Sequence, residues 1–180
     1  MERGIMIPLT SEEHARSVAS FPVRFPSALP QGFELTKFIQ WWPPWMTEEK
    51  RSAKVHADFV ETTYEDDAQG LLMVTQGFVS KFIGLVQHGL APADSGGPIS
   101  LDGRDAFWLT ALPRSGPEKV GGRMVIKDWE KGACVCVGWE DGSVPAPAGG
   151  WGDSQRYYSI YSTTLSLQDV VLVAKSVGRD

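Results

Sequence analysis

The sequence predicts an α+β fold: a curved antiparallel β-sheet with an N-terminal helix and a closing C-terminal helix packed on one face. Segments that alternate apolar and polar residues, as half-buried strands do, fill the middle of the chain. Turn residues separate several of these segments at hairpin spacing. Helix-capping signatures stand near the two ends, and the chain lacks the repeated strand–helix units of a parallel sheet.

The bulk composition is that of a single globular domain, which we expect to span residues 1–180. Of the 180 residues, 42% are hydrophobic and 22% are charged, so the chain can bury a core of its own. The net charge of −5 argues against a nucleic-acid partner, because phosphate binding needs a basic surface. No apolar run approaches the roughly 18–20 residues of a membrane span, so we expect a soluble chain.

The N-terminal half is expected to hold one helix and three strands. Thr10-Ser11-Glu12-Glu13 predicts a capping box with Thr10 as the N-cap residue. The helix should end before Phe21-Pro22, because the residue preceding proline avoids helical angles. A proline-rich segment then extends to Pro30. Strands are expected over residues 33–40, 53–64 and 71–78, and residues 81–90 fit either a helix or a strand.

The C-terminal half is expected to form two hairpins and a last strand. Asp102-Gly103 is the strongest hairpin signal, and Glu130-Lys131-Gly132 predicts a second turn. Residues 141–153 are rich in glycine and proline and predict a surface loop. The strands of this half are expected over residues 99–101, 106–112, 124–129, 133–139 and 157–161.

A closing helix is predicted after Ser166. The stretch S-L-Q-D at residues 166–169 is a capping signature. An apolar stripe at helical spacing follows, and the open face of the sheet is the natural place to bury it. The stripe consists of Leu167, Val170, Val171, Ala174 and Val177.

Cys134 and Cys136 stand one residue apart on a predicted strand and therefore share one face of the sheet. So short a separation disfavours a disulfide between them. Two thiols alone do not complete a zinc site, which wants about four ligands. We interpret them as small sheet-face residues and expect neither a metal nor a cofactor.

Asp94-Ser95-Gly96-Gly97-Pro98 resembles the nucleophile motif of trypsin-like serine proteases. That family has a glycine before the aspartate, where this chain has Ala93, and none of the three histidines stands in the family's context. A catalytic triad needs a base and a group that orients it, as well as the serine. We therefore interpret the motif as a polar turn between two strands.

His56 and Asp58 share the polar face of a predicted strand, where such a pair can hold a metal or tune a general base. No third ligand stands at an informative spacing, so a solvated sheet face is the alternative that we favour. Glu65-Asp66-Asp67 lacks the spacing of a calcium loop and predicts a solvated turn.

Trp41-Trp42-Pro43-Pro44-Trp45 is expected to interrupt the strand before it and to form a stiff aromatic segment. Three indoles on such a segment cannot all point into one core, and Trp151 in the glycine-rich stretch adds a fourth. Exposed aromatic side chains mark ligand grooves and interfaces. Trp41, Trp42, Trp45 and Trp151 are therefore the candidate ligand-binding residues; the alternative is that these rings cap one end of the sheet as peripheral core.

The stretch F-P-V-R-F-P-S-A-L-P-Q-G-F-E-L at residues 21–35 resembles the opening of a bacterial domain family of unknown function. That family often lies C-terminal to a membrane helix in anti-sigma-factor-like and other cell-surface proteins. Five later stretches follow the family's order: Y-E-D-D-A-Q-G-L-L-M-V-T-Q, I-S-L-D-G-R-D-A, V-G-W-E-D-G-S, Y-Y-S-I-Y-S and L-S-L-Q-D-V-V-L-V-A-K-S-V.

This resemblance spans most of residues 21–177. Under this resemblance the domain is extracytoplasmic if an anchor was removed from a longer protein, and the sequence itself leaves the localisation open. It transfers no catalytic residue, because the family has none established. The aromatic segment at residues 41–45 departs from the family's pattern and is particular to this chain.

Three hypotheses for function follow. The first is a non-enzymatic binding or sensory domain whose partner, another protein or an apolar ligand, contacts the tryptophans. The second is a carrier that holds an apolar small molecule or lipid between the sheet and the closing helix. The third is an enzyme, either a hydrolase using Ser95 or a metal enzyme using His56 and Asp58.

Overall fold

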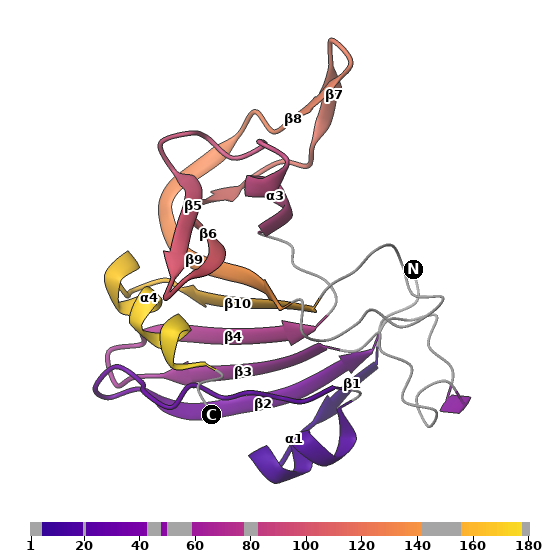
Figure 1. Cartoon of the computed structure of the whole chain (residues 1–180), viewed down its shortest axis with the longest axis vertical. Coiled ribbons are helices and arrows are strands. Elements are labelled where there is room, and N and C mark those ends of the chain that lie inside the picture. The colour runs from indigo at the N-terminus through magenta and orange to yellow at the C-terminus, as the bar shows by residue number, and fades with distance from the viewer. Residues whose placement is uncertain are drawn as a thin grey trace.

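The structure is a computed structural model that describes residues 5–19, 21–42, 48–49, 59–77, 83–141 and 156–177. In this part of the chain, eight antiparallel strands form one sheet in the order β1-β2-β3-β4-β10-β9-β6-β5, and β7 and β8 form a separate hairpin (Figure 1). The broad α+β class predicted from the sequence is therefore confirmed. The elements are β1 (Ile5–Pro8), α1 (Glu12–Val18), β2 (Glu34–Trp42), β3 (Phe59–Glu65), β4 (Leu71–Gly77), α3 (Ile83–Gln87), β5 (Gly96–Leu101), β6 (Arg104–Pro113), β7 (Glu118–Val120), β8 (Arg123–Val125), β9 (Trp129–Asp141), β10 (Arg156–Ser162) and α4 (Leu167–Ser176).

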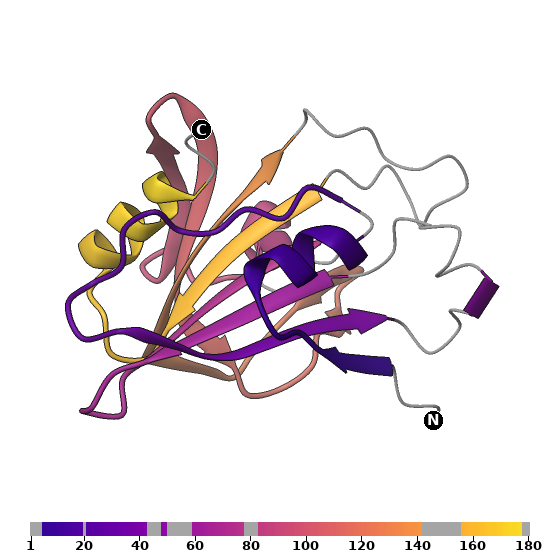
Figure 2. The ribbon, with the colours of Figure 1, turned by 90° about the horizontal axis from the view of Figure 1, so that it is seen from below.

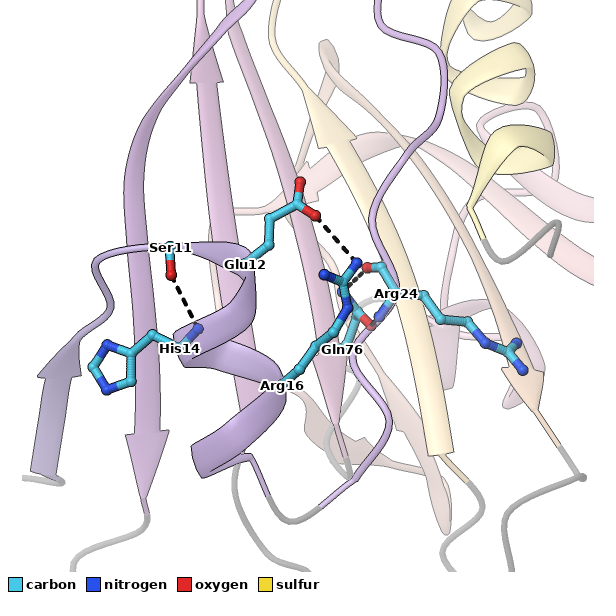
Figure 3. Close-up of polar contacts among 6 residues, drawn as sticks. All are labelled: Ser11, Glu12, His14, Arg16, Arg24 and Gln76. Carbon is cyan, nitrogen blue, oxygen red and sulfur yellow. Dashed lines mark hydrogen bonds and ion pairs between the residues drawn. The ribbon is translucent and has the colours of Figure 1, made fainter.

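The first helix begins one residue later than its sequence suggests. Ser11 is the N-cap, and its hydroxyl accepts a hydrogen bond of 3.0 Å from the backbone N–H of His14 (Figure 3). Thr10 instead contacts the imidazole, with 3.1 Å between its hydroxyl and His14 Nδ1. The prediction of a Thr10 cap is therefore wrong: Ser11 is also a favoured N-cap residue, and its hydroxyl caps the helix although only Thr10 has a glutamate three residues later.

Strand β2 continues through Trp41 and Trp42, so the chain leaves the strand later than predicted. Both tryptophans pair with β1, which was not predicted at all. The ambiguous segment at residues 81–90 contains the short helix α3. Residues 53–58 of the predicted strand and residues 142–153 of the predicted loop lie outside the described residues.

The hairpin predicted at Asp102-Gly103 is present between β5 and β6. Both residues have left-handed backbone angles, with φ of 53° and 87°. The strand before this turn begins at Gly96, so the glycines of the D-S-G-G-P motif belong to β5 and only Asp94 and Ser95 remain in a turn.

The second predicted hairpin is wrong, because Glu130, Lys131 and Gly132 lie inside the continuous strand β9. Gly132 has φ of 71° and stands where the pairing of β9 with β6 shifts register. Its left-handed angle therefore forms an irregularity within the strand instead of a reversal. The chain reverses earlier, at Gly121-Gly122, where φ values of 56° and 84° suit a two-residue hairpin turn.

One face of the sheet is buried beneath α1, the proline-rich segment and α4 (Figure 2). Residues directly opposite on neighbouring strands share a face, and the registers align Gln40, Val60, Gln76, Tyr158 and Trp139 in one row across five strands. Each of these side chains is at most 1% exposed. We call this side the helix face. Its larger cluster includes Val170, Val173, Ala174 and Val177 from the end of the chain.

The proline-rich segment is fixed to the helix face by Gln76 (Figure 3). The backbone N–H of Arg24 donates to Gln76 Oε1 at 2.8 Å, and Gln76 Nε2 donates to the Arg24 carbonyl. The Arg24 guanidinium then pairs with Asp141 at 2.9 Å. Because this buried amide serves both backbone groups of Arg24, the segment crosses the sheet without leaving those groups unsatisfied.

The closing helix has the cap that its sequence predicts. The Ser166 hydroxyl accepts from the Asp169 backbone N–H at 3.2 Å, and the Asp169 carboxylate accepts from the Ser166 backbone N–H at 3.3 Å. Val170 and Ala174 are fully buried against the sheet. Beyond the helix, Val177 forms a bridge with Pro26, so the end of the chain is tied to the proline-rich segment.

Replacing Gly103 with alanine should lower the free energy of unfolding by about 1 kcal/mol, because a Cβ is disfavoured at φ of 87°. Gly116→Ala is the matched control, since that glycine has no left-handed angle and a Cβ there meets open space. Urea unfolding of both variants measures the difference. Equal losses would contradict the left-handed turn.

Candidate functional site

The face of the sheet opposite the helix face carries a row of apolar side chains. The registers align Met6, Trp41, Phe59, Gly77 and Tyr157 across β1, β2, β3, β4 and β10. We call these five positions the aromatic row. Since adjacent strands lie about 4.8 Å apart, the row spans roughly 19 Å.

The centre of the aromatic row is a pair of stacked rings. The centroids of Trp41 and Phe59 lie 4.9 Å apart at an interplanar angle of 28°. Both rings are partly exposed, and Met6 beside them is 66% exposed. Gly77 follows without a side chain, so Phe59 and Tyr157 are separated by one position that has only backbone. The row therefore has an apolar end formed by Met6, Trp41 and Phe59, and it has the Tyr157 ring on the other side of Gly77.

Polar groups lie at the Tyr157 end of the row. Tyr157 stands opposite Glu140 on β9, and Gln87 Nε2 donates to Glu140 Oε1 at 2.6 Å. Burial raises the pKa of Tyr157, and the negative charge of Glu140 together with its hydrogen bond raises it further. The phenol therefore stays neutral at physiological pH, and this end of the row can exchange hydrogen bonds with a ligand.

The structure separates two of the four tryptophans proposed from the sequence. Trp42 is 2% exposed and shares the helix face with Gln40, two residues before it, so it belongs to the interior of the domain. Trp41 points to the opposite face and is the one described tryptophan of the four that reaches the surface. Trp45 and Trp151 lie outside the described residues.

Sequence reasoning missed Met6, Phe59 and Tyr157 as neighbours of Trp41. Their spacing along the chain carries no signal, because the row is assembled from strands far apart in sequence. Alternation within each strand predicts which residues share a face, but only strand order and register decide which of them become neighbours.

The geometry around Ser95 gives a hydrolase no support. Ser95 is 3% exposed, and its hydroxyl donates to Asp94 Oδ1 at 3.1 Å. The hydrogen bonds from Lys131 and Ser95 lower the pKa of Asp94. A carboxylate with a lowered pKa is a weak base, so this contact does not activate the hydroxyl as a nucleophile.

No metal site emerges from the described ranges, in which no three histidine, cysteine or acidic side chains gather as ligands. His56 and Asp58 lie outside those ranges. Asp66, at the predicted solvated turn, accepts a hydrogen bond of 2.6 Å from the Gly70 backbone N–H through Oδ1. That carboxylate therefore shapes the turn between β3 and β4.

The space between α4 and the sheet is filled by protein side chains. Val170 and Ala174 of α4 have no exposed surface and lie in the same cluster as Trp139, Tyr158 and Ile160. A shallow pocket of about 430 Å³ lies elsewhere, at the end of α4, where Lys175 and Asp102 form an ion pair of 2.9 Å. An apolar ligand between helix and sheet would therefore need to displace packed core.

Comparison with known proteins gives no match to any protein-family model, curated protein or solved structure. Within the described residues, no helix combines the length and the apolar character needed to cross a bilayer. The surfaces of the domain itself are therefore what bears on its function.

Trp42→Ala should lower the free energy of unfolding by about 3–5 kcal/mol, as expected for removing a buried ring. Trp41→Ala should cost only roughly 1–2 kcal/mol, because its ring is partly exposed and loses mainly the Phe59 stack. Chemical denaturation of both variants measures these losses. If Trp41→Ala destabilised the domain as much as Trp42→Ala, Trp41 would be a core residue.

The two thiols should resist alkylation in the folded domain. Burial raises the pKa of Cys134 to about 11 and raises that of Cys136 further. At neutral pH both groups are therefore thiols, which are poor nucleophiles. Iodoacetamide at about pH 8 should modify neither cysteine until denaturant is added, as mass spectrometry would reveal.

The same pKa shifts set a direction for stability. The folded protein holds these protons more tightly than the unfolded chain, whose thiols titrate near about pH 8.5. The contribution of the buried thiols to the free energy of unfolding is thus complete below that pH, and for Cys134 it is lost as the pH rises toward about 11.

Fast alkylation of the native protein at neutral pH would contradict the buried placement of the two cysteines.

Proposed function

We propose that this chain is a non-enzymatic binding domain that recognises another polypeptide through the aromatic row. The observation that carries the proposal is the partly exposed Trp41–Phe59 stack beside the 66% exposed Met6. Large apolar side chains in one patch on the surface are typical of interaction sites. Tryptophan and tyrosine are also the residues most enriched where binding energy concentrates.

The shape of the row supports a polypeptide partner. It lies on the face of a sheet and is not an enclosed cavity, so a small molecule would remain largely in contact with water. A length of roughly 19 Å matches about six residues of extended chain. Tyr157 and Glu140 provide polar groups at one end, which would fix the register of such a segment.

The chemistry of the remaining candidates also supports a role without catalysis. Ser95 is buried next to a weak base, and both cysteines are protonated at neutral pH. The resemblance of residues 21–177 to a family of bacterial cell-surface and anti-sigma-factor-like domains is compatible with a sensory role outside the cytoplasm. We therefore propose that the domain acts outside the cytoplasm.

A library of random peptides displayed on phage tests the proposal. The domain should enrich peptides that contain aromatic or branched aliphatic residues. Trp41→Ser and Met6→Ser should each lower the affinity for the selected peptides at least tenfold, because a large apolar contact buried on binding contributes about 1.4 kcal/mol or more. Binding of synthetic peptides by titration calorimetry measures the effect.

Leu172→Ser is the matched control, because Leu172 is 57% exposed on α4 and lies outside the aromatic row. It should leave peptide binding unchanged. The proposal fails if no sequence is enriched, or if Leu172→Ser and Trp41→Ser weaken the selected peptides equally.

A further inference from the structure

The hairpin of β7 and β8 projects from the body of the domain (Figure 1). In the part of the chain that the structure describes, its strands pair only with each other. Each strand has three residues, and a hairpin this short has little stability of its own in water. Its shape must therefore depend on how its base is held.

Several contacts fix the base of the hairpin. The Arg114 backbone N–H donates to the Asp128 carbonyl at 3.0 Å, and Lys127 pairs with Glu118 at 2.8 Å. The Trp129 indole donates to the Ile126 carbonyl at 2.9 Å, and the Ile126 side chain is 5% exposed. The base is thus anchored to β6 and β9, which hold the hairpin out from the sheet.

The tip of the hairpin, residues 119–124, is free of such contacts. Val120 is 45% exposed and Met124 is 50% exposed. Lys119 and Arg123 are exposed, and the side chain of neither forms a hydrogen bond or ion pair within the described part of the chain. A fixed base with a tip whose side chains contact nothing else in the described domain is typical of an element that binds a partner.

The charge of the hairpin is opposite to that of the chain. Residues 114–127 contain four basic side chains and one acidic side chain, while the whole chain has a net charge of −5. Arg114 pairs with Glu130 and Lys127 pairs with Glu118, so the excess positive charge of the hairpin lies at Lys119 and Arg123 near its tip. An anionic surface would attract this tip and repel the rest of the molecule.

The two sides of the tip are alike. Lys119 stands opposite Met124, and Val120 stands opposite Arg123. Successive pairs project to opposite sides of the ribbon, so each side carries one cation and one apolar side chain. A partner protein that docks on one side would favour an apolar side and a polar side. A tip that carries a cation and an apolar side chain on each of its two sides is better suited to insertion into a surface that contacts both sides at once.

We propose that the β7–β8 tip binds the surface of an anionic lipid bilayer. Lys119 and Arg123 contact headgroup phosphates and carboxylates, while Val120 and Met124 enter the boundary between headgroups and acyl chains. Gly121 and Gly122 at the turn leave the leading edge narrow, since neither has a side chain. The aromatic row takes no part in this contact.

Flotation with lipid vesicles tests the proposal. The domain should float with vesicles of phosphatidylcholine and phosphatidylserine, and should not float with phosphatidylcholine alone. Lys119→Gln with Arg123→Gln should lower the partition coefficient at least tenfold, because each basic residue near such a surface contributes severalfold. Val120→Ser with Met124→Ser should lower it by a similar factor. Raising the salt concentration from about 0.1 M to about 1 M should release the domain from the vesicles, because the Debye screening length falls from about 10 Å to about 3 Å.

Leu35→Ser with Lys37→Gln is the matched control, because Leu35 is 45% exposed and Lys37 is exposed on β2, away from the hairpin. This variant and Trp41→Ser should float as the wild type does, which separates the lipid contact from the aromatic row. All hairpin variants should melt at the wild-type temperature, since the replaced side chains are exposed. The proposal is overturned if the wild type ignores anionic vesicles, if the hairpin variants still float, or if the tip binds soluble polyglutamate but no vesicle.

Discussion

Strand β10 lies between β4 and β9, and its register decides which side chains of the sheet reach the core. Tyr158 and Ile160 point to the helix face and are at most 1% exposed. Tyr157, Ser159 and Tyr161 alternate with them and are partly exposed on the other face. A slip of one residue would exchange the two sets, leaving apolar core in water and polar groups against α4. Both the buried interior and the aromatic row depend on this one alignment.

The helix face is costly to build because it buries polar groups beside apolar ones. Gln40, Gln76 and Arg156 are at most 1% exposed. Gln76 is satisfied by the backbone of Arg24, and the Arg156 guanidinium lies 4.0 Å above the Phe21 ring. Such groups are tolerated only when their partners are fixed. Gln40 donates to the Val18 carbonyl of α1, while the proline-rich segment supplies the partners of Gln76 and Arg156, which explains why an extended segment without regular structure belongs to the core.

The two proposed surfaces use different physical devices. The aromatic row is a shallow strip assembled from distant strands, whose rings become neighbours through register. The β7–β8 tip is local in sequence and gains its exposure from an anchored base. If both act, the domain would hold a polypeptide on its open face while the hairpin contacts an anionic surface, and the two contacts would not compete for the same residues.

Local signals were sufficient for part of this fold. Ser166 with Asp169 specified the start of α4, and Asp102-Gly103 specified a turn, because each depends on chemistry within a few residues. The prediction at Thr10 was wrong because the neighbouring Ser11 hydroxyl caps the helix. The prediction at Gly132 was wrong because β9 pairs with β6 on both sides of this glycine and continues as one strand. The α+β class and the alternation within the strands could be predicted from the amino-acid pattern alone. That Trp42 is core and Trp41 lies at the surface could not, because the burial of each ring depends on register with strands distant in the chain.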